Sequence, residues 1–495
     1  MAARKVNALM LSGLLVGQSL LAASPKPSLA EDPTQMGKAN DGESQESAPW
    51  RGRSPEELRV WARENLHHKL IGSRVIDAKQ HPEWAWFRKS GLGLFLHWGP
   101  ASLPPGNGDA WAMMWSEGRA KNNLLALPED MFAAAEKWNP SNYDPEMWMK
   151  AAARAGFGYA VLTTRHHDGY CLWPTEHGDW DTGEHMNGRD LVKDYIEACR
   201  ENGIRTGLYY SGPNWHFDYK NRDFSHPPQG YDYRHKKIDG FTQAKDIDVR
   251  SNAESALQVR DLLTRYGPID MIWWDGNTIM PEDEVQKLQP GIFVARGNIA
   301  TPEGKHQGKS RNVKVTNEAG WWWELCQKTE NTETPYWHYH PSLETNRWDA
   351  NRFLSELVRC RALGGNLLAN VTPRPDGTMM DWFYEVCDEM AGWMAHSREA
   401  VYDVDLEPPL PMLDKTDNPV TVRGTTWYAM PDPQNRVEIH DVAKPATVTL
   451  LRTGEPIEHT FDDGTLGLTV PESMRTSLPD MVKITFSAPT EPIQR

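Results

Sequence analysis

The chain has few cysteines, and none are paired at the spacing of a metal or redox motif. Its 495 residues contain five, which are Cys171, Cys199, Cys326, Cys360 and Cys387. This odd, scattered set excludes a disulfide framework and a zinc knuckle, although an oxidising compartment would leave room for one or two bridges. Basic residues are also outnumbered: 53 Lys and Arg against 68 Asp and Glu give a net charge of −15. That balance argues against a general nucleic-acid-binding role and leaves only a local basic pocket open.

Extended apolar runs are missing except at the amino terminus. Residues 1–30 combine a positive start, an interrupted apolar centre and small residues before two candidate cleavage positions, Ala23 and Ala30. We therefore predict a signal peptide and a secreted or periplasmic protein; a membrane anchor is the alternative, disfavoured because the run is short. No later stretch reaches 18 apolar residues, so we expect no membrane association after cleavage. Residues 31–50 are polar and predict a flexible leader.

Tryptophan, by contrast, is abundant. The chain has 22 Trp against 12 Phe and 15 Tyr. An indole offers a flat apolar face and one N–H donor, which suits the apolar face and hydroxyl edge of a sugar ring. Filling a large core is an equally good explanation for any single tryptophan.

A repeating unit of helix, glycine and apolar strand occupies the middle of the chain. Strand-like runs that are apolar throughout occur at residues 93–96, 159–162, 207–210, 271–274, 292–295 and 367–369. Strands without alternation are typical of a parallel sheet covered on both faces. The first of these strands ends in His-Trp-Gly-Pro and not in a Gly-rich phosphate loop, so an α/β fold with a (β/α)8-like barrel over residues 51–403 is favoured over an open doubly wound sheet.

From about residue 404 the pattern changes. Short runs such as residues 420–422, 437–439 and 482–486 alternate in polarity and are separated by turn residues. This predicts a C-terminal antiparallel β-sandwich over residues 404–495. A packing role for it is the simplest expectation, because no sugar-binding motif stands out.

Polar residues stand where the predicted strands end, which is the catalytic face of such barrels. They are His97, the pair His166-His167, Tyr209 to Ser211, Asp275, and 366–370. Asp275 follows four apolar residues and precedes a glycine, so its carboxylate is the leading catalytic candidate; capping the turn is the alternative. The three histidines with Asp275 could also form a zinc site, but no HxH or HExxH spacing supports one.

Five ordered sequence blocks resemble the α-L-fucosidases of glycoside hydrolase family 29. They are residues 86–99, 159–173 (YAVLTTRHHDGYCLW), 189–211, 272–276 (IWWDG) and 364–377. Glu399 to Tyr402 resembles the exit into the sandwich, so the resemblance runs from about residue 84 to residue 404.

The resemblance implies a retaining, exo-acting fucosidase with two carboxyl groups and no cofactor or metal. Asp275 would be the nucleophile, and a second carboxyl group would protonate the leaving oxygen and then deprotonate water. The residues implied for substrate binding are His97, Trp98, His166, His167, Trp173, Tyr210, Trp273 and Trp111.

The acid/base residue stays ambiguous in the sequence. Glu324, in a Trp-Glu-Leu-Cys segment, ranks first, Glu318 second, and Glu303 is a weaker fit. The loop after His97 also departs from the family pattern, because a glutamate expected to bind a sugar hydroxyl is missing. Asp109 or Glu117 would replace it, and Trp111 or Trp115 would serve as an aromatic platform.

Two other functions remain open at this point. One is a catalytically silent carbohydrate-binding barrel, and the other is a zinc-dependent barrel hydrolase. The expected partner is a fucosylated glycan; linkage, aglycone and oligomeric state are not readable. Arg165 and Arg296, near the expected mouth, are compatible with a sulfated sugar.

Overall fold

The computed structural model describes residues 81–221, 231–232, 234–240, 247–276, 279–280, 282–295, 301, 303–304, 322–407 and 410–489. The predicted signal peptide and leader lie outside the described residues, as does Glu318.

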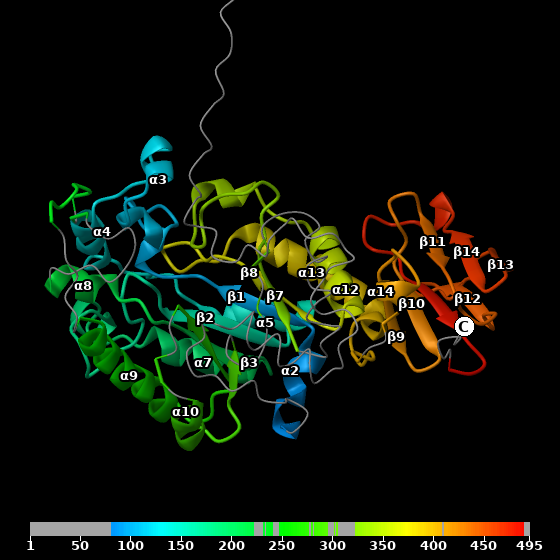
Figure 1. Ribbon diagram of the computed structural model, residues 1–495, viewed down its shortest axis with the longest axis horizontal. Coiled ribbons are helices and arrows are strands. Elements are labelled where there is room, and N and C mark those ends of the chain that lie inside the picture. The colour runs from blue at the N-terminus through cyan, green and yellow to red at the C-terminus, as the bar shows by residue number, and fades with distance from the viewer. Residues whose placement is uncertain are drawn as a thin grey trace, which may run out of the picture. The chain divides into compact units, whose positions relative to one another are not determined.

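One parallel sheet forms the centre of the first domain (Figure 1). Its strand order is β5-β4-β3-β2-β1-β8-β7-β6, and all its pairings are parallel. The strands are β1 (Leu92–Leu96), β2 (Tyr159–Arg165), β3 (Arg205–Ser211), β4 (Met271–Asp275), β5 (Phe293–Ala295), β6 (Glu303–Gly304), β7 (Glu324–Lys328) and β8 (Asn366–Asn370). The predicted (β/α)8-like barrel is confirmed, and within the described residues no pairing joins β5 to β6.

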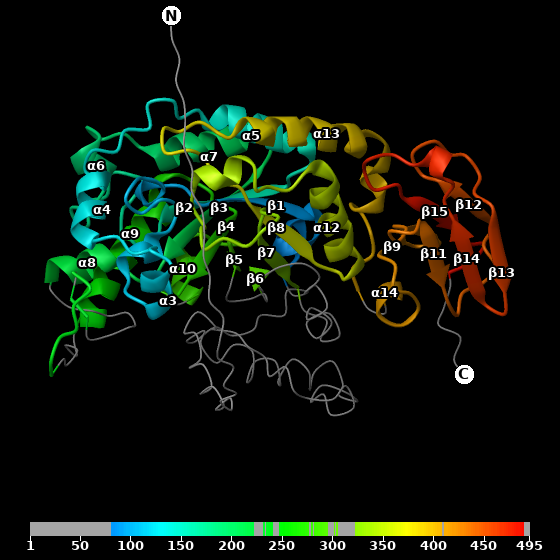
Figure 2. The same cartoon turned by 90° about the horizontal axis from the view of Figure 1, so that it is seen from above.

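Helices flank this sheet (Figure 2). The longer ones are α5 (Pro145–Ala155), α7 (Leu191–Glu201), α9 (Ile247–Arg265), α12 (Ala350–Ala362) and α13 (Asp381–Ser397). The shorter ones are α2 (Ala85–Ser90), α3 (Glu117–Lys121), α4 (Pro128–Ala135), α6 (Thr182–His185), α8 (Trp215–Asn221), α10 (Glu282–Leu288) and α14 (Pro411–Asp414). Short 3-10 turns are η2 (Pro82–Trp84), η3 (Pro100–Ser102), η4 (Ala110–Met113), η6 (Pro341–Glu344), η7 (Arg398–Ala400) and η8 (Glu472–Met474).

Helix ends follow the local sequence. Asp144 accepts a hydrogen bond from the backbone N–H of Met147 at the start of α5, with Pro145 in the first turn. Gly156 ends the same helix at φ 98°, a left-handed conformation that glycine adopts without strain. Asp190 caps α7 in the same way, through the N–H of Lys193.

Successive side chains of each strand point to opposite faces, and this decides which residues reach the barrel interior. Tyr209 and Trp273 belong to the interior cluster with Phe95. Their neighbours Tyr210 and Trp274 belong to the larger cluster that includes the inward faces of the helices. Both faces of the strands are therefore buried, which explains why the sequence shows apolar runs without alternation.

The second domain is an antiparallel sandwich, as predicted. One sheet has the order β12-β15-β10-β9 and the other β11-β14-β13. The strands are β9 (Val420–Arg423), β10 (Thr426–Ala429), β11 (Arg436–Ile439), β12 (Thr447–Leu450), β13 (His459–Asp462), β14 (Thr465–Thr469) and β15 (Val482–Thr485). The chain meets this domain at Asp405, which pairs with Val422 of β9.

The two domains share polar contacts. The hydroxyl of Thr421 donates to the backbone carbonyl of Ala400 (2.6 Å), and the Lys483 ammonium lies 2.8 Å from Glu399. These contacts anchor the sandwich to η7, the last helical turn of the barrel domain.

All five cysteines are buried and free, so no disulfide forms between them. Across the described segments, no helix is both long and apolar enough to span a bilayer.

Candidate active site

Asp275 is the last residue of β4 and lies at the carboxyl end of the sheet, here called the mouth of the barrel. The Tyr209 hydroxyl donates to its Oδ2 (2.8 Å), and the backbone N–H of Gly276 donates to its Oδ1 (2.9 Å). Its side chain is 22% exposed. Two donors thus fix the carboxylate while part of it stays accessible, which is what a nucleophile requires.

Four histidines line the same region. The rings of His166 and His167 lie 4.3 Å apart, His166 lies 4.6 Å from His338, and His97 lies 5.5 Å from both His166 and His338. His97, His166 and His167 are brought together as predicted. His338 was missed as a site residue, although the aromatic run around it was a usable signal.

Burial keeps two of these histidines neutral. It lowers the pKa of His166 and of His338 well below the usual value, and the charges of neighbouring histidines lower both further. Nδ1 of His166 and both ring nitrogens of His338 are buried without a hydrogen-bond partner among the described residues. Neutral imidazoles offer one donor and one acceptor each, which suits the hydroxyl groups of a sugar.

The other two histidines are oriented by neighbouring side chains. Nδ1 of His97 lies 2.7 Å from Oδ1 of Asn370, whose amide N–H group donates to the carbonyl of Trp337. Nδ1 of His167 lies 2.6 Å from the Ser211 hydroxyl, and its Nε2 lies 3.6 Å from Oδ2 of Asp275. In both rings a hydrogen bond at Nδ1 therefore fixes the orientation of the imidazole.

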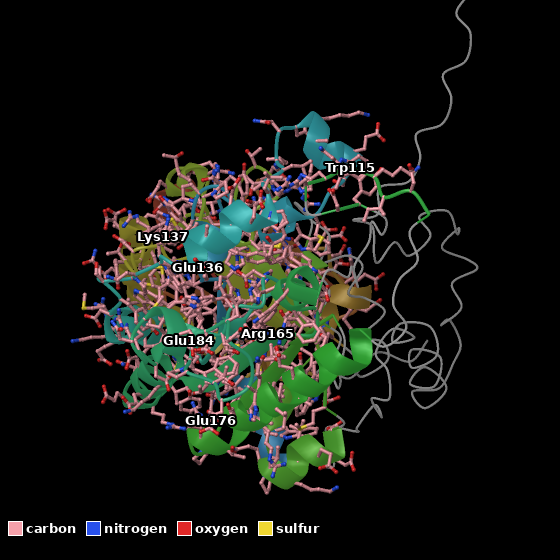
Figure 3. The ribbon with its side chains drawn as sticks, turned by 90° about the vertical axis from the view of Figure 1, so that its left-hand side faces the viewer. Trp115, Glu136, Lys137, Arg165, Glu176 and Glu184 are labelled. Atoms are coloured by element: carbon pink, nitrogen blue, oxygen red, sulfur yellow. The ribbon has the colours of Figure 1, made fainter. Side chains whose placement is uncertain are left out.

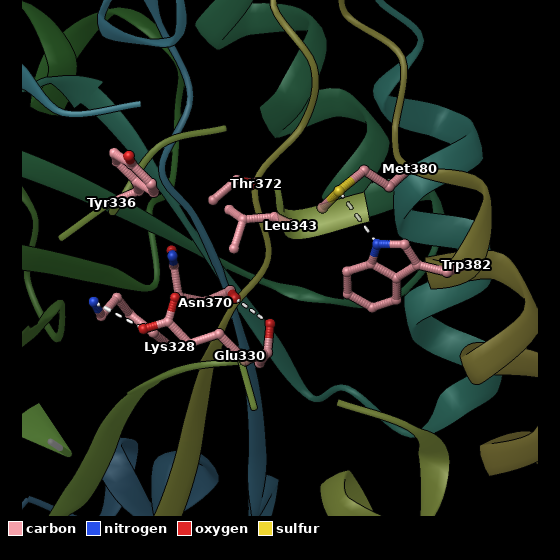
Figure 4. A pocket seen from close by; sticks show the side chains of 9 residues that line it. Lys328, Glu330, Tyr336, Leu343, Asn370, Thr372, Met380 and Trp382 are labelled. Atoms are coloured by element: carbon pink, nitrogen blue, oxygen red, sulfur yellow. Dashed lines mark hydrogen bonds and ion pairs between the residues drawn. The ribbon is translucent and has the colours of Figure 1, made fainter. Parts of the chain in front are cut away.

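The ends of β7 and β8 lie side by side around Asn370, the hydrogen-bond partner of His97 (Figure 4). The Thr329 hydroxyl donates to the carbonyl of Asn370 (2.7 Å), and Lys328 pairs with Glu330 at 3.0 Å. These residues line a small cavity that also includes Tyr336 and Trp382.

Aromatic rings form the remaining walls. The Trp111 ring lies 5.5 Å from His167 and 5.0 Å from Trp215, and the Trp337 ring lies 5.0 Å from His97. Trp273 lies beneath, 5.4 Å from Tyr209. Trp111 and Trp273 were predicted for this site. Trp215 was not, because nothing in the sequence distinguishes it from a core tryptophan. Trp337 was not either, although it stands next to His338 in the run Tyr336 to Tyr339.

The structure does not bring Tyr210 to the site. Its hydroxyl donates to Gln258 (2.8 Å) and its ring lies under the Arg165 guanidinium, on the helix side of the sheet. Its neighbour Tyr209 faces the site instead, because alternation along β3 turns Tyr209 toward the barrel interior.

Trp98 and Trp173 also lie away from the histidines. Trp98 is stacked on Tyr143 at 4.6 Å and donates to the carbonyl of Arg374. Trp173 is fully buried in the same outer cluster. Both are core residues between the sheet and the helices. They stand in the same sequence blocks as the histidines, so the sequence alone does not show that they face away from the site.

Glu324 lies at the other end of the barrel from Asp275. It is the first residue of β7, fully buried, and accepts hydrogen bonds from the Tyr159 hydroxyl (2.6 Å) and from Nε1 of Trp273 (2.9 Å). Tyr159 is itself the first residue of β2. This position among the strand starts does not fit the predicted acid/base role. Glu318 lies outside the described residues, and of Glu303 only the backbone is described.

In the loop after His97, the structure shows the positions of Asp109 and Glu117, the two residues expected to replace the missing sugar-binding glutamate. Asp109 is buried, accepts from the N–H of Trp111 (2.9 Å) and lies 3.2 Å from Arg119. Burial raises its pKa, and Arg119 opposes that effect. Glu117 is exposed and pairs with Lys121. Asp109 therefore supports the Trp111 loop, and Glu117 faces solvent.

Three groups at the mouth have the spacing of a metal site. His166, His167 and Asp275 each offer one atom, and these atoms lie within 4.8 Å of one another. Oδ2 of Asp275 is already the acceptor for Tyr209. Measuring activity after treatment with a chelator distinguishes a metal-dependent site from a metal-free one.

A barrel mouth with one anchored carboxylate, neutral histidines and aromatic walls fits the class of glycoside hydrolases. A sequence model described as alpha-L-fucosidase matches residues 64–399. The chain belongs to the α-L-fucosidase family, and it is a glycoside hydrolase of that family.

The chain is also similar in sequence and in fold to individual α-L-fucosidases. The chain is 28% identical over 355 residues to the tissue alpha-L-fucosidase of Bos taurus, covering 66% of this chain and 70% of that one. Among solved structures, alpha-L-fucosidase isoenzyme 1 from Paenibacillus thiaminolyticus is 25% identical with a TM-score of 0.65, covering 83% of this chain and 99% of that one. A family 29 fucosidase from Bacteroides thetaiotaomicron, trapped as a covalent intermediate with 2-fluoro-fucosyl fluoride, is 22% identical with a TM-score of 0.65, covering 84% and 97%.

Proposed function

We propose that this enzyme removes terminal α-L-fucosyl residues from oligo- or polysaccharides with retention of configuration. The observation that carries the proposal is Asp275, held by Tyr209 and Gly276 at the barrel mouth beside four histidines. The covalent intermediate trapped in the Bacteroides thetaiotaomicron fucosidase supports a double displacement.

In the first step Asp275 attacks the anomeric carbon while an acid protonates the departing glycosidic oxygen. A fucosyl ester on Asp275 results. Water then cleaves this ester, and the residue that acted as the acid in the first step now deprotonates the water. The Tyr209 hydroxyl and the Gly276 N–H hold the carboxylate in position, so little reorganisation is needed when it reacts. The histidines and tryptophans bind hydroxyl groups and exclude water.

For the acid/base we propose Glu318 over Glu324. The buried position of Glu324 at the strand starts supports this order, since an acid must reach the glycosidic oxygen at the mouth. Replacement of Glu318 by Gln should lower kcat by about 10²- to 10⁴-fold on a substrate with a poor leaving group. The loss should be smaller on an aryl fucoside, whose leaving group needs little protonation.

The central test is Asp275→Ala assayed with an aryl α-L-fucoside. Activity should be lost, and added azide should restore turnover by yielding β-L-fucosyl azide. Asp270→Ala is the matched control at the other end of β4, where Asp270 binds Arg205 and the N–H of Thr206. Full activity of Asp275→Ala, or release of β-L-fucose first from the wild-type enzyme, would refute the mechanism.

We also propose that the protein is exported and that residues 1–30 are removed. Mass spectrometry of the exported protein checks this through its amino terminus. For the zinc alternative, activity should persist after dialysis against a strong chelator. Loss of activity that returns with Zn²⁺ would establish a role for the His166, His167 and Asp275 cluster as a metal site.

A further inference from the structure

A fully buried arginine lies directly behind the catalytic residues. Arg165 ends β2, one residue before His166, and its side chain is 0% exposed. The pairing of β2 with β3 shifts register between Thr163 and Arg165, an irregularity that re-aims side chains at a strand end. In Figure 3 Arg165 lies among packed side chains, whereas Trp115 lies at the periphery.

The guanidinium binds three successive carbonyls of one loop. Its Nη2 lies 2.6 Å from the carbonyl oxygen of Ser211 and 3.3 Å from those of Gly212 and Pro213. Its Nη1 donates to Gln258 (2.8 Å) and to the Ser255 hydroxyl (3.0 Å) of α9. A planar fork of donors is needed to reach acceptors on two elements at once, and an ammonium group cannot reproduce it.

The same loop, residues 211–215, forms hydrogen bonds with Asp275 and His167. The Gly212 N–H donates to the backbone carbonyl of Asp275 (2.8 Å), and the Trp215 N–H donates to the carbonyl of His167 (2.8 Å). The Ser211 hydroxyl binds Nδ1 of His167 (2.6 Å).

The Ser211 contact also selects the tautomer of His167. Because a carbonyl oxygen can only accept, we assign the single hydroxyl proton to the carbonyl of Pro213 (3.0 Å), and Ser211 then accepts from Nδ1–H of His167. Nε2, 3.6 Å from Oδ2 of Asp275, is then an acceptor when the ring is neutral and a donor when it is protonated.

We propose that Arg165 is a positioning residue for the hydrolytic reaction, because it fixes the 211–215 loop that sets the backbone of Asp275 and the tautomer of His167. Arg165 thus acts through the loop and not on a sulfated substrate, because every part of its side chain is buried. The inference rests on the proposed function, since it assumes that Asp275 reacts.

The chain supplies a matched control in Arg361. It is also buried (1% exposed) and binds backbone carbonyls, those of Val401 (2.8 Å) and Gly365 (3.1 Å). It also binds Asn366, the first residue of β8, and so serves the opposite end of the barrel. Any general effect of replacing a buried arginine should appear in both Arg165→Lys and Arg361→Lys.

The experiment compares wild type with these two variants in three measurements. They are the melting temperature, kcat and KM on an aryl α-L-fucoside across pH, and the rate at which 2-fluoro-fucosyl fluoride labels the protein by mass. Both variants should have a lower melting temperature than the wild-type protein. Only Arg165→Lys should lose kcat and labelling rate together, by about ten- to a hundredfold per folded molecule, with an altered pH profile.

The outcomes are distinguishable. If wild type is not labelled at Asp275, the proposed function fails. If wild type is labelled and Arg165→Lys matches Arg361→Lys in kcat, labelling rate and pH profile, Arg165 is only structural and the inference is overturned. Should Arg165→Lys not fold, Ser255→Ala removes one side-chain acceptor of the Arg165 guanidinium. It should lower kcat and shift the pH profile, and unchanged values there overturn the inference equally.

Discussion

Replacing Glu324 by glutamine separates a structural carboxyl group from a catalytic one. In the wild-type protein Oε2 of Glu324 accepts a hydrogen bond from the Tyr159 hydroxyl, and Oε1 accepts one from Nε1 of Trp273. Glutamine has nearly the same shape but only one oxygen. Its amide N–H group must therefore face one of the two donors.

The size of the effect follows from that mismatch. One buried donor is left unsatisfied, which costs about 1–3 kcal/mol of unfolding free energy. Since the side chain lies at the strand starts, kcat per folded molecule should change by no more than about twofold. An acid/base residue would lose about 10²- to 10⁴-fold in rate. The two roles therefore differ by at least an order of magnitude in one assay.

The assay pairs denaturant unfolding with fucoside hydrolysis, normalised to folded protein. Tyr159→Phe serves as the matched control, because it removes one donor from the same carboxyl group. The double variant should lose less stability than the sum of the single variants, since both changes disrupt one contact. A kcat loss of a hundredfold with unchanged stability in Glu324→Gln would refute the reasoning and return Glu324 to the catalytic site.

Three further changes test the site. Tyr209→Phe should lower kcat about tenfold by removing the donor to Asp275, whereas Tyr210→Phe should lower only the melting temperature; equal kcat losses would contradict the strand orientation. Gly276→Ala should destabilise the protein by about 1–3 kcal/mol and lower kcat, because φ is +75° and a Cβ would lie 2.7 Å from Cδ of Pro213; a wild-type melting curve would argue against this strain. The depressed pKa of His338 means that the unfolded chain binds a proton below about pH 6.5 that the folded chain does not, so stability falls as pH falls, by up to about 1.4 kcal/mol per pH unit. His338→Gln should reduce that slope below about pH 6.5, and an unchanged slope would assign the acid sensitivity elsewhere.

The sequence by itself determined the barrel, the sandwich and the position of the leading carboxylate. Uninterrupted apolar runs identified strands covered on both faces, and capping pairs such as Asp144-Pro145 marked helix starts. Asp275 could be found because a carboxylate directly after four apolar residues has to emerge at a strand end. These are local consequences of chain geometry, and they need no knowledge of distant contacts.

Only the tertiary structure decided which side of each strand a residue faces and which strand end it occupies. Tyr209 and Tyr210 are chemically identical neighbours, so nothing local distinguishes the one that binds Asp275 from the one that binds Gln258. Glu324 matched a motif, but the start of β7 lies among the strand starts and away from the mouth. His338 and Arg165 acquire their surroundings from segments more than 40 residues away, and such long-range juxtapositions arise from packing and leave no local pattern in the sequence.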